Sequence, residues 1–238
     1  MEILSIIPAR GGSKGVPRKN IRLMNGKPLI SYSILSSIKS ELITRTIVSS
    51  DDEEILSIAK KYNADVPFVR PSELAQDHIT DFPVFDHCLK WLLDNENYIP
   101  DIIVHLRPTS PFRDVKDIDA CIKKLKLDDN ADSIRSVCRV SQHPLKMWKI
   151  SDDKLEPFFR YENLDFSEPF NMPRQKLPFA YVQNGCIDVI RYNTIMKYGS
   201  MSGNSILPYI MNIEDAVNID TELDWSNAAG LMKKRNRK

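Results

Sequence analysis

Hydrophobic positions in the first half of the chain follow two alternating spacings. Four short, continuous apolar runs are typical of strands that are buried on both faces of a parallel sheet. Between these runs, apolar residues recur at helical spacing, and the segments begin with residues that favour helix starts. The predicted strands are residues 3–7, 44–48, 66–69 and 101–106, and the predicted helices are 28–38, 51–59, 80–93 and 115–127.

Strands that alternate with helices of this length predict an α/β fold around a mostly parallel sheet flanked by helices. The pattern changes at residues 139–178, which are rich in proline and aromatic residues and have weak periodicity. Because a disordered linker rarely carries so many aromatics, we expect an ordered insertion that packs against a second surface. Strands at 180–191 and 206–211 and a helix at 221–233 follow, and we treat residues 1–238 as one domain.

Composition excludes several classes of protein. The chain is 42% hydrophobic and 27% charged, as in ordinary globular proteins, and 33 Lys and Arg against 32 Asp and Glu give a net charge of +1. This balance disfavours a globally basic nucleic-acid binder. The first apolar run is too short for a signal peptide, and no stretch approaches the roughly 20 apolar residues that span a bilayer. We therefore expect a cytoplasmic protein with no nucleic-acid or membrane partner.

The spacing of the cysteines and histidines indicates no zinc site, no disulfide framework and no catalytic triad. None of the four cysteines forms a C-x-x-C pair, so we expect buried or half-buried thiols in a reducing compartment. His78, His87 and His105 are predicted to be structural residues of helix or strand segments, whereas His143 is placed near the pocket.

Charge is unevenly distributed along the chain. No acidic residue occurs between Ile3 and Ser40, whereas this stretch contains seven cations. Its centre is the loop PARGGSKGVPRKN (8–20), directly after the first predicted strand, where α/β folds bind ligands. Glycines allow backbone N–H groups to approach an anion closely, and the cations suit a triphosphate. The loop matches neither G-x-x-x-x-G-K-[ST] nor G-x-G-x-x-G.

The loop resembles the signature of the acylneuraminate cytidylyltransferases, the CMP-sialic acid synthetases. Six later blocks match that family's motifs in the same order, so the resemblance covers almost the whole chain. These blocks are RPSELAQD (70–77), LRPTSPFR (106–113), HPLK (143–146), PRQKLP (173–178), NG (184–185) and NIDTELD (218–224).

The resemblance implies transfer of CMP from CTP to the anomeric hydroxyl of an acidic nine-carbon sugar, with release of pyrophosphate. It also implies a Rossmann-like nucleotidyltransferase fold. The segment at 139–178 resembles the family's dimerisation insertion, so we expect a homodimer whose active site is completed across the interface.

The same resemblance assigns roles to residues of this chain. Cations of the first loop would hold and neutralise the triphosphate, other residues would bind the nucleotide, and a third group would contact the sugar. The catalytic cations are Arg10, Lys14 and Lys19; the nucleotide-binding residues are Gly11, Gly12, Ser13, Gly15, Asn20 and Arg70; the sugar-binding residues are Arg107, Lys146, Arg174, Asn184 and Gly185.

Mg²⁺ is the expected cofactor, with Asp220 as the best ligand. The family usually has Asp-x-Asp here, but this chain has Asn218 in place of the first carboxylate. An amide oxygen can still coordinate the metal, although one negative charge is lost. Glu222 and Asp224 are predicted in the first turn of the last helix, where acids favour the helix dipole.

Two further differences from the family's usual residues concern the sugar substrate. Arg107 stands where glutamine is common, and Asp188 stands where an aromatic residue is common. Both changes alter polarity, so we expect a sugar other than N-acetylneuraminate, such as a legionaminate or pseudaminate type. Guanylyl transfer and ketodeoxyoctonate activation remain open, although the glycine loop argues against the latter. Asn218 also leaves open a non-catalytic nucleotide-sensing module. The basic residues 233–238 are predicted to be a solvated tail.

Overall fold

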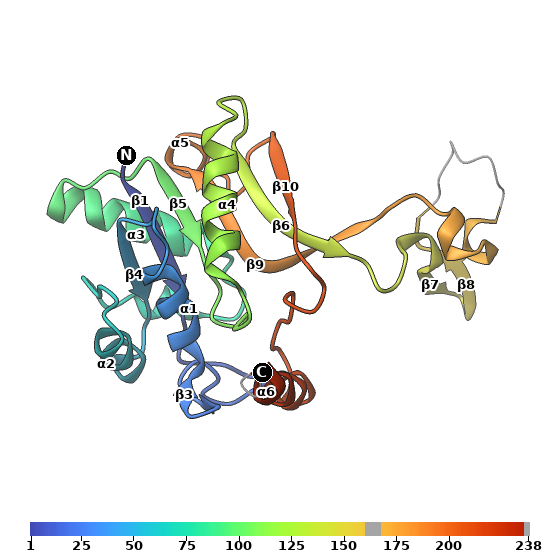
Figure 1. Ribbon diagram of the computed structural model, residues 1–238, viewed down its shortest axis with the longest axis horizontal. Coiled ribbons are helices and arrows are strands. Elements are labelled where there is room, and N and C mark those ends of the chain that lie inside the picture. Colours follow the sequence, from blue (N-terminus) through green and yellow to red (C-terminus); the bar gives the residue numbers. More distant parts are fainter. Residues whose placement is uncertain (160–167, 236–238) are drawn as a thin grey trace.

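A six-stranded sheet forms the centre of the computed structural model, which describes residues 1–159 and 168–235 (Figure 1). The strand order is β10-β6-β9-β5-β1-β4. The strands are β1 (Ile3–Pro8), β4 (Arg45–Ser49), β5 (Ile102–His105), β6 (Ser133–Arg139), β9 (Tyr181–Arg191) and β10 (Ile206–Ile210).

Most neighbouring strands in this sheet are parallel. β1 pairs in parallel with β4 and β5, and β10 pairs in parallel with β6. β9 alone runs antiparallel to both of its neighbours, β5 and β6. The mostly parallel α/β sheet predicted from the apolar runs is therefore confirmed.

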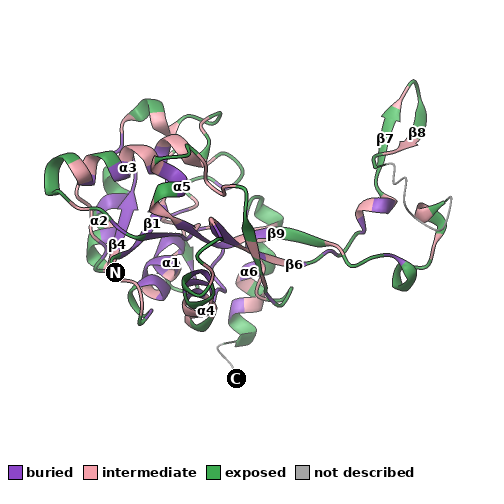
Figure 2. Ribbon diagram, turned by 90° about the horizontal axis from the view of Figure 1, so that it is seen from above, coloured by how far each residue is buried: buried purple, intermediate pink, exposed green. Residues whose placement is uncertain are grey.

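Helices cover both faces of the sheet because the buried strands carry apolar side chains on both sides. In β1, Ile3 and Ile7 point into one core and Leu4 and Ile6 into the other. Figure 2 shows the buried strands between these layers. One face is covered by α1 (Leu29–Ile38), α2 (Glu53–Lys61) and α4 (Val115–Lys126), and the other by α3 (Asp81–Glu96) and α5 (Tyr192–Met196).

Two local predictions are wrong. Residues 66–69 form no strand; the chain touches β4 only through a bridge between Ile47 and Asp65, and Phe68 then packs on Trp91. The apolar run therefore marks a packed loop. The helix predicted from Asp51 is capped instead by Asp52, whose Oδ1 accepts the N–H of Ile55 at 3.0 Å.

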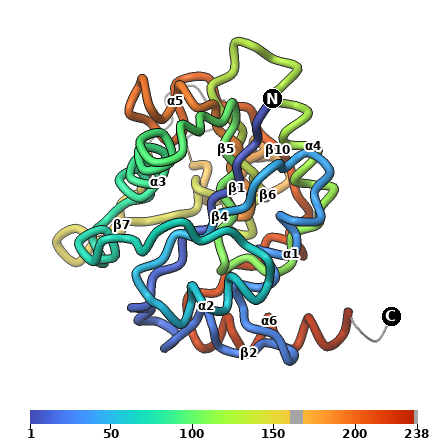
Figure 3. The backbone as a smooth tube through the Cα atoms, turned by 90° about the vertical axis from the view of Figure 1, so that its left-hand side faces the viewer, coloured from blue at the N-terminus to red at the C-terminus, as the bar shows by residue number. Residues whose placement is uncertain are grey.

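A third apolar cluster joins the two ends of the described chain. α6 (Glu222–Arg235) packs Trp225 against Val16 and Met24, close to the small hairpin of β2 (Leu23–Met24) and β3 (Lys27–Pro28) (Figure 3). Glu222 and Asp224 lie in the first turn of α6, as predicted. This packing brings the segment before α6 back to the loop that follows β1.

The insertion projects from the body at the ends of β6 and β9 (Figures 1 and 2). Its described residues contain the hairpin of β7 (Trp148–Ser151) and β8 (Lys154–Pro157) and the short 3-10 turns Pro144–Lys146, Pro169–Asn171 and Arg174–Lys176. Several large apolar side chains remain exposed here, including Ile150 at 77%. The predicted aromatic contributions of Tyr161 and Phe166 fall outside the described residues.

Candidate active site

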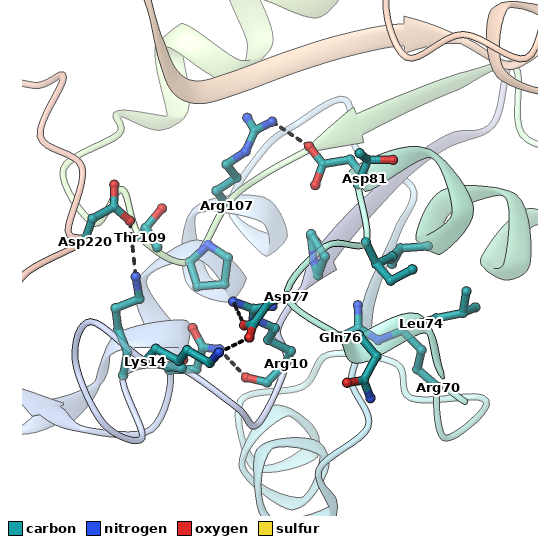
Figure 4. Close-up of a pocket in the computed structure, with 18 of the residues that line it drawn as sticks. Arg10, Lys14, Arg70, Leu74, Gln76, Asp77, Asp81, Arg107, Thr109 and Asp220 are labelled. Carbon is teal, nitrogen blue, oxygen red and sulfur yellow. Dashed lines mark hydrogen bonds and ion pairs between the residues drawn. The ribbon is translucent and has the colours of Figure 1, made fainter. Parts of the chain in front are cut away.

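A cavity of about 390 Å³ opens at the carboxyl ends of β1 and β5 (Figure 4). Its walls come from the loop after β1, residues 70–84, the loop after β5, and Asp220. Ligands of open α/β sheets bind at this edge, because strand ends and connecting loops converge there. Nine predicted site residues line the cavity: Arg10, Ser13, Lys14, Gly15, Lys19, Asn20, Arg70, Arg107 and Asp220.

Close backbone packing explains two glycines of the loop. The Gly11 N–H donates to Asp51 Oδ1 at 3.0 Å, and a Cβ on Gly11 would lie 2.7 Å from Asp52 Oδ2. A Cβ on Gly15 would lie 2.0 Å from the carbonyl oxygen of Asp220, whereas one on Gly12 would meet nothing within 4 Å. Gly15 therefore allows the loop to close onto the segment before α6.

Two of the predicted triphosphate cations share one carboxylate. Arg10 Nη2 lies 3.0 Å from Asp77 Oδ1, and Lys14 Nζ pairs with Asp77 Oδ2. The hydrogen bond from Lys14 and the nearby charges lower the pKa of Asp77. Asp77 thus places an anionic group between two cations of the cavity (Figure 4).

The third cation, Lys19, connects the loop to the segment that contains Asp220. Its Nζ donates to the Ile219 carbonyl oxygen at 2.6 Å and lies 3.4 Å from Asp220 Oδ1. Asn20 is buried, and its Nδ2 donates to the Arg10 carbonyl oxygen at 3.0 Å. The two residues fix the shape of the loop as well as its charge.

Arg70 places a buried guanidinium in the opposite wall. It is 4% exposed, and its nearest carboxylate oxygen, on Asp51, lies 3.5 Å away. Burial lowers its pKa, and its Nε has no hydrogen-bond partner among the described residues. A buried guanidinium with an unpaired N–H group favours an anionic ligand.

The predicted sugar-binding residues separate into three locations. Arg107 lines the cavity, where its guanidinium contacts Asp81 Oδ2 at 2.8 Å and Asp188 Oδ2 at 2.9 Å. Gly185 adopts φ +67° beside Arg107. Asn184 lies behind the wall, and its Oδ1 accepts the Ser136 hydroxyl at 2.6 Å.

Lys146 and Arg174 lie on the insertion, away from this cavity. Lys146 Nζ donates to the Phe170 carbonyl oxygen at 3.0 Å, and Arg174 donates to the Val140 carbonyl oxygen. Arg174 and His143 belong to a second cavity of about 310 Å³ at the base of the insertion. The structure therefore does not bring these residues to the cavity that Arg10, Lys19 and Arg70 line in the same chain.

Comparison with known proteins identifies the family. Residues 4–215 match the family model described as cytidylyltransferase. The chain belongs to the cytidylyltransferase family.

Curated relatives of this family agree with the match. N-acylneuraminate cytidylyltransferase of Escherichia coli is 32% identical over 99% of this chain, which spans 53% of that longer protein. CMP-N,N'-diacetyllegionaminic acid synthase of Legionella pneumophila is 32% identical over 98% of this chain and 97% of its own length.

A solved structure shares the fold. CMP:2-keto-3-deoxy-manno-octonic acid synthetase complexed with CTP superimposes with a TM-score of 0.70 at 16% identity, covering 99% of this chain and 100% of that one. At this identity the comparison concerns the fold alone, and it supports the predicted nucleotidyltransferase architecture.

The residues predicted to hold Mg²⁺, Asn218 and Asp220, offer one amide and one carboxylate. Asn218 Nδ2 donates to Asp220 Oδ2 at 2.5 Å, which leaves the Asn218 amide oxygen available. Across residues 1–159 and 168–235, no three His, Cys, Asp or Glu side chains cluster as a metal site. Mg²⁺ is often held by one or two carboxylates together with substrate phosphates, so the residues present fit it.

Sequence reasoning missed the roles of three side chains in the cavity. Asp77 and Asp81 were given no function, and His105 was predicted to be only structural, yet all three line the wall. Asp77 precedes α3, Asp81 begins α3 and His105 ends β5, so only the tertiary fold brings the three together at one cavity. The four cysteines are buried, and no helix within the described chain has the length and apolarity needed to cross a membrane.

Proposed function

We propose that this chain transfers CMP from CTP to the anomeric hydroxyl of a nonulosonic, sialic-acid-like sugar and releases pyrophosphate. The observation that carries the proposal is the cationic glycine loop, which faces Asp220 across one cavity in a member of the cytidylyltransferase family. Relatives named for acylneuraminate and legionaminate substrates supply the substrate class.

Catalysis would come from positioning the two substrates and from neutralising the charge of the phosphates. The oxygen of the anomeric hydroxyl attacks the α-phosphorus and its proton passes to solvent, the bond from the α-phosphorus to the oxygen that bridges the α- and β-phosphates breaks, and negative charge builds on the departing pyrophosphate. Arg10, Lys14 and Lys19 would neutralise this charge, and Arg70 would help hold the nucleotide. This displacement needs no covalent nucleophile.

Asp220 and the amide oxygen of Asn218 would hold Mg²⁺ together with phosphate oxygens. The ion would supply further neutralisation of the phosphates. Lys19 lies 3.4 Å from Asp220 Oδ1, so the lysine would orient that carboxylate from the loop side.

Two copies of the chain would complete each site. Within one chain, Arg107 is already paired with two carboxylates, while Lys146 and Arg174 lie on the projecting insertion. The insertion of a partner copy would bring cations for the sugar carboxylate. Its exposed apolar side chains would be buried against the other copy. Because the reaction uses CTP, we propose that it takes place in the cytoplasm.

A pyrophosphate-release assay tests the proposal. It crosses four nucleoside triphosphates with N-acetylneuraminate, legionaminate, pseudaminate and ketodeoxyoctonate types of sugar acid, with Mg²⁺ present. Release with CTP and a nonulosonate is expected, whereas release only with GTP or only with ketodeoxyoctonate contradicts the assignment.

A nucleotide-sensing module is the second candidate, since Asn218 replaces a carboxylate with an amide that donates to Asp220. Binding of CTP without pyrophosphate release from any sugar acid would support it.

A further inference from the structure

One end of the cavity is formed where two carboxylates hold a single guanidinium. Arg107 follows β5, Asp81 begins α3, and Asp188 lies on β9. Arg107 Nη2 donates to Asp81 Oδ2 at 2.8 Å, and Arg107 Nη1 donates to Asp188 Oδ2 at 2.9 Å. We call these three residues the Arg107 corner. Arg107 and Asp81 line the cavity (Figure 4), whereas Asp188 lies behind the lining and is 2% exposed.

The charges of the corner cancel where a ligand would meet them. The corner contributes one guanidinium, of Arg107, and one carboxylate, of Asp81, to the cavity lining. Behind the lining, Asp188 is opposite Arg135 in the pairing of β6 with β9, and the buried Arg113 donates to the Arg107 carbonyl oxygen at 2.7 Å. Hydrogen bonding, and not an excess of either charge, therefore decides what binds at the corner.

The two carboxylates give the Arg107 guanidinium one orientation. His105 also faces them, but its Nδ1 lies 3.9 Å from Asp81 Oδ2 and 3.8 Å from Asp188 Oδ2, both too far for a hydrogen bond. Burial lowers the pKa of His105 well below its usual value, and Arg107 lowers it further, so the imidazole is neutral. Both carboxylate oxygens are therefore left to Arg107, which cannot turn without breaking a charge-assisted hydrogen bond.

One donor and one acceptor of the corner remain unused. Besides its bonds to the two carboxylates, Arg107 Nη1 lies 3.4 Å from the Gly185 carbonyl oxygen. The Nε–H group of Arg107 has no hydrogen-bond partner among the described residues. Asp81 accepts through Oδ2, and its Oδ1 likewise has no partner in the part of the chain that the structure describes. The corner therefore offers a donor and an acceptor from two neighbouring side chains.

A neutral group that both donates and accepts matches this arrangement. A hydroxyl can donate to Asp81 Oδ1 and accept from Arg107, and a secondary amide can do the same with its N–H and C=O groups. An ionised carboxylate only accepts. It would leave Asp81 Oδ1 without a donor and would place a second negative charge beside Asp81.

We propose that the Arg107 corner binds a neutral substituent of the sugar, a hydroxyl or an acylamino group, and that the sugar's carboxylate points away from it. Asp81 and Arg107 contact this substituent. Asp188 does not reach the cavity and is a positioning residue that acts through Arg107. The proposal rests on the proposed function and deepens it, because the carboxylate is then left to the cations of a partner's insertion.

The first test removes groups from the substrate. It uses the nonulosonate with the fastest pyrophosphate release, analogues that each lack one hydroxyl or one acylamino group, and an analogue with a carboxamide in place of the carboxylate. For one of the first analogues, kcat/KM of the wild type should fall at least about tenfold, and in Asp81→Ala this loss should shrink to about threefold or less. The loss with the carboxamide should be the same in both proteins. Asp86→Ala, on the same helix but paired with Lys90, is the matched control and should behave as the wild type.

The second test separates positioning from a structural role. Asp188→Asn should raise the KM for the sugar about fivefold, because a charged partner of Arg107 is lost, while the affinity for CTP stays unchanged. In an Arg107→Gln background, the same substitution should change this KM by less than about twofold, since Asp188 acts through Arg107. A purely structural role of Asp188 would give the same loss in both backgrounds and overturns its assignment.

The identity of the analogue whose loss shrinks in Asp81→Ala shows whether the corner binds a hydroxyl or an acylamino group. A loss that shrinks only for the carboxamide, or for no analogue, overturns the proposal and leaves the proposed function intact. Should Asp81→Ala fail to fold, as judged by circular dichroism and CTP binding, Asp188→Asn with the same analogues decides between these outcomes. Absence of pyrophosphate with every nonulosonate, although CTP binds, contradicts the proposed function and the proposal together.

Discussion

At the residue scale, the cavity is a set of cations held in place by a few acids. Arg10 and Lys14 share Asp77, while Lys19 meets Asp220 and the Ile219 carbonyl group. The loop cations could be predicted from the sequence because they share one short segment. Asp77 could not, because its role exists only when its segment folds over the loop.

Lys19→Ala should reduce turnover by at least about 100-fold, as expected when a donor aimed at developing charge is lost. Lys19 is 13% exposed in the cavity wall, so water cannot fully replace its charge. The measurement is kcat by pyrophosphate release, with the melting temperature as a check on folding. Lys39→Ala, an exposed cation at the end of α1, is the control and should retain wild-type turnover; equal activity in both variants contradicts the role of Lys19.

Asp77→Asn should tighten CTP binding by about threefold, because the triphosphate no longer competes with an exposed carboxylate for Arg10 and Lys14. Isothermal titration with CTP at low ionic strength measures the effect, which should shrink as salt is added. Glu73→Gln removes an acid from the same segment and should leave the affinity unchanged. Weaker binding in Asp77→Asn would mean that the carboxylate organises the site.

At the scale of elements, the approach of the glycine loop to the segment before α6 defines the cavity. Most helices and strands were predictable, since their apolar spacing matches how they are buried. The loop at residues 66–69 was not predictable. An apolar run indicates burial, but it does not indicate whether the segment pairs with a neighbouring strand. The contact between Gly15 and Asp220 depends on folding over 205 positions and has no local signal.

Gly15→Ala should lower kcat/KM by about 100-fold, the scale of a 1 Å misplacement in an active site. The added Cβ would meet the Asp220 carbonyl oxygen at 2.0 Å and push the two segments apart. Gly12→Ala is a matched control in the same loop, since its Cβ would find open space. Comparable losses in both variants would show that loop flexibility, and not this close approach, limits activity.

At the scale of the whole molecule, the projecting insertion is the feature that a single chain does not explain. Its aromatic content predicts an ordered insertion, and the described part contains a hairpin and short turns. The homodimer stays a prediction, because a sequence reports which side chains are apolar and cannot report what covers them.

Ile150→Asp should shift the protein from dimer to monomer and reduce turnover by at least about tenfold. Ile150 is 77% exposed on β7, and a charge there opposes burial against a second copy. Light scattering after size exclusion gives the mass, and pyrophosphate release gives the activity. Leu127→Asp changes a leucine that is 87% exposed at the end of α4 and should alter neither. A wild-type monomer with full activity contradicts the shared site.

The bond from Lys19 to the Ile219 carbonyl group also has a consequence for synthesis. The two residues are 200 positions apart, so at about 5–20 residues per second the loop leaves the ribosome roughly 10–40 seconds before its partner exists. During that interval a nascent chain carries the cationic half of a nucleotide site without the acidic half. A message interrupted before codon 219 would therefore yield a product whose central sheet is complete but whose cavity lacks one wall.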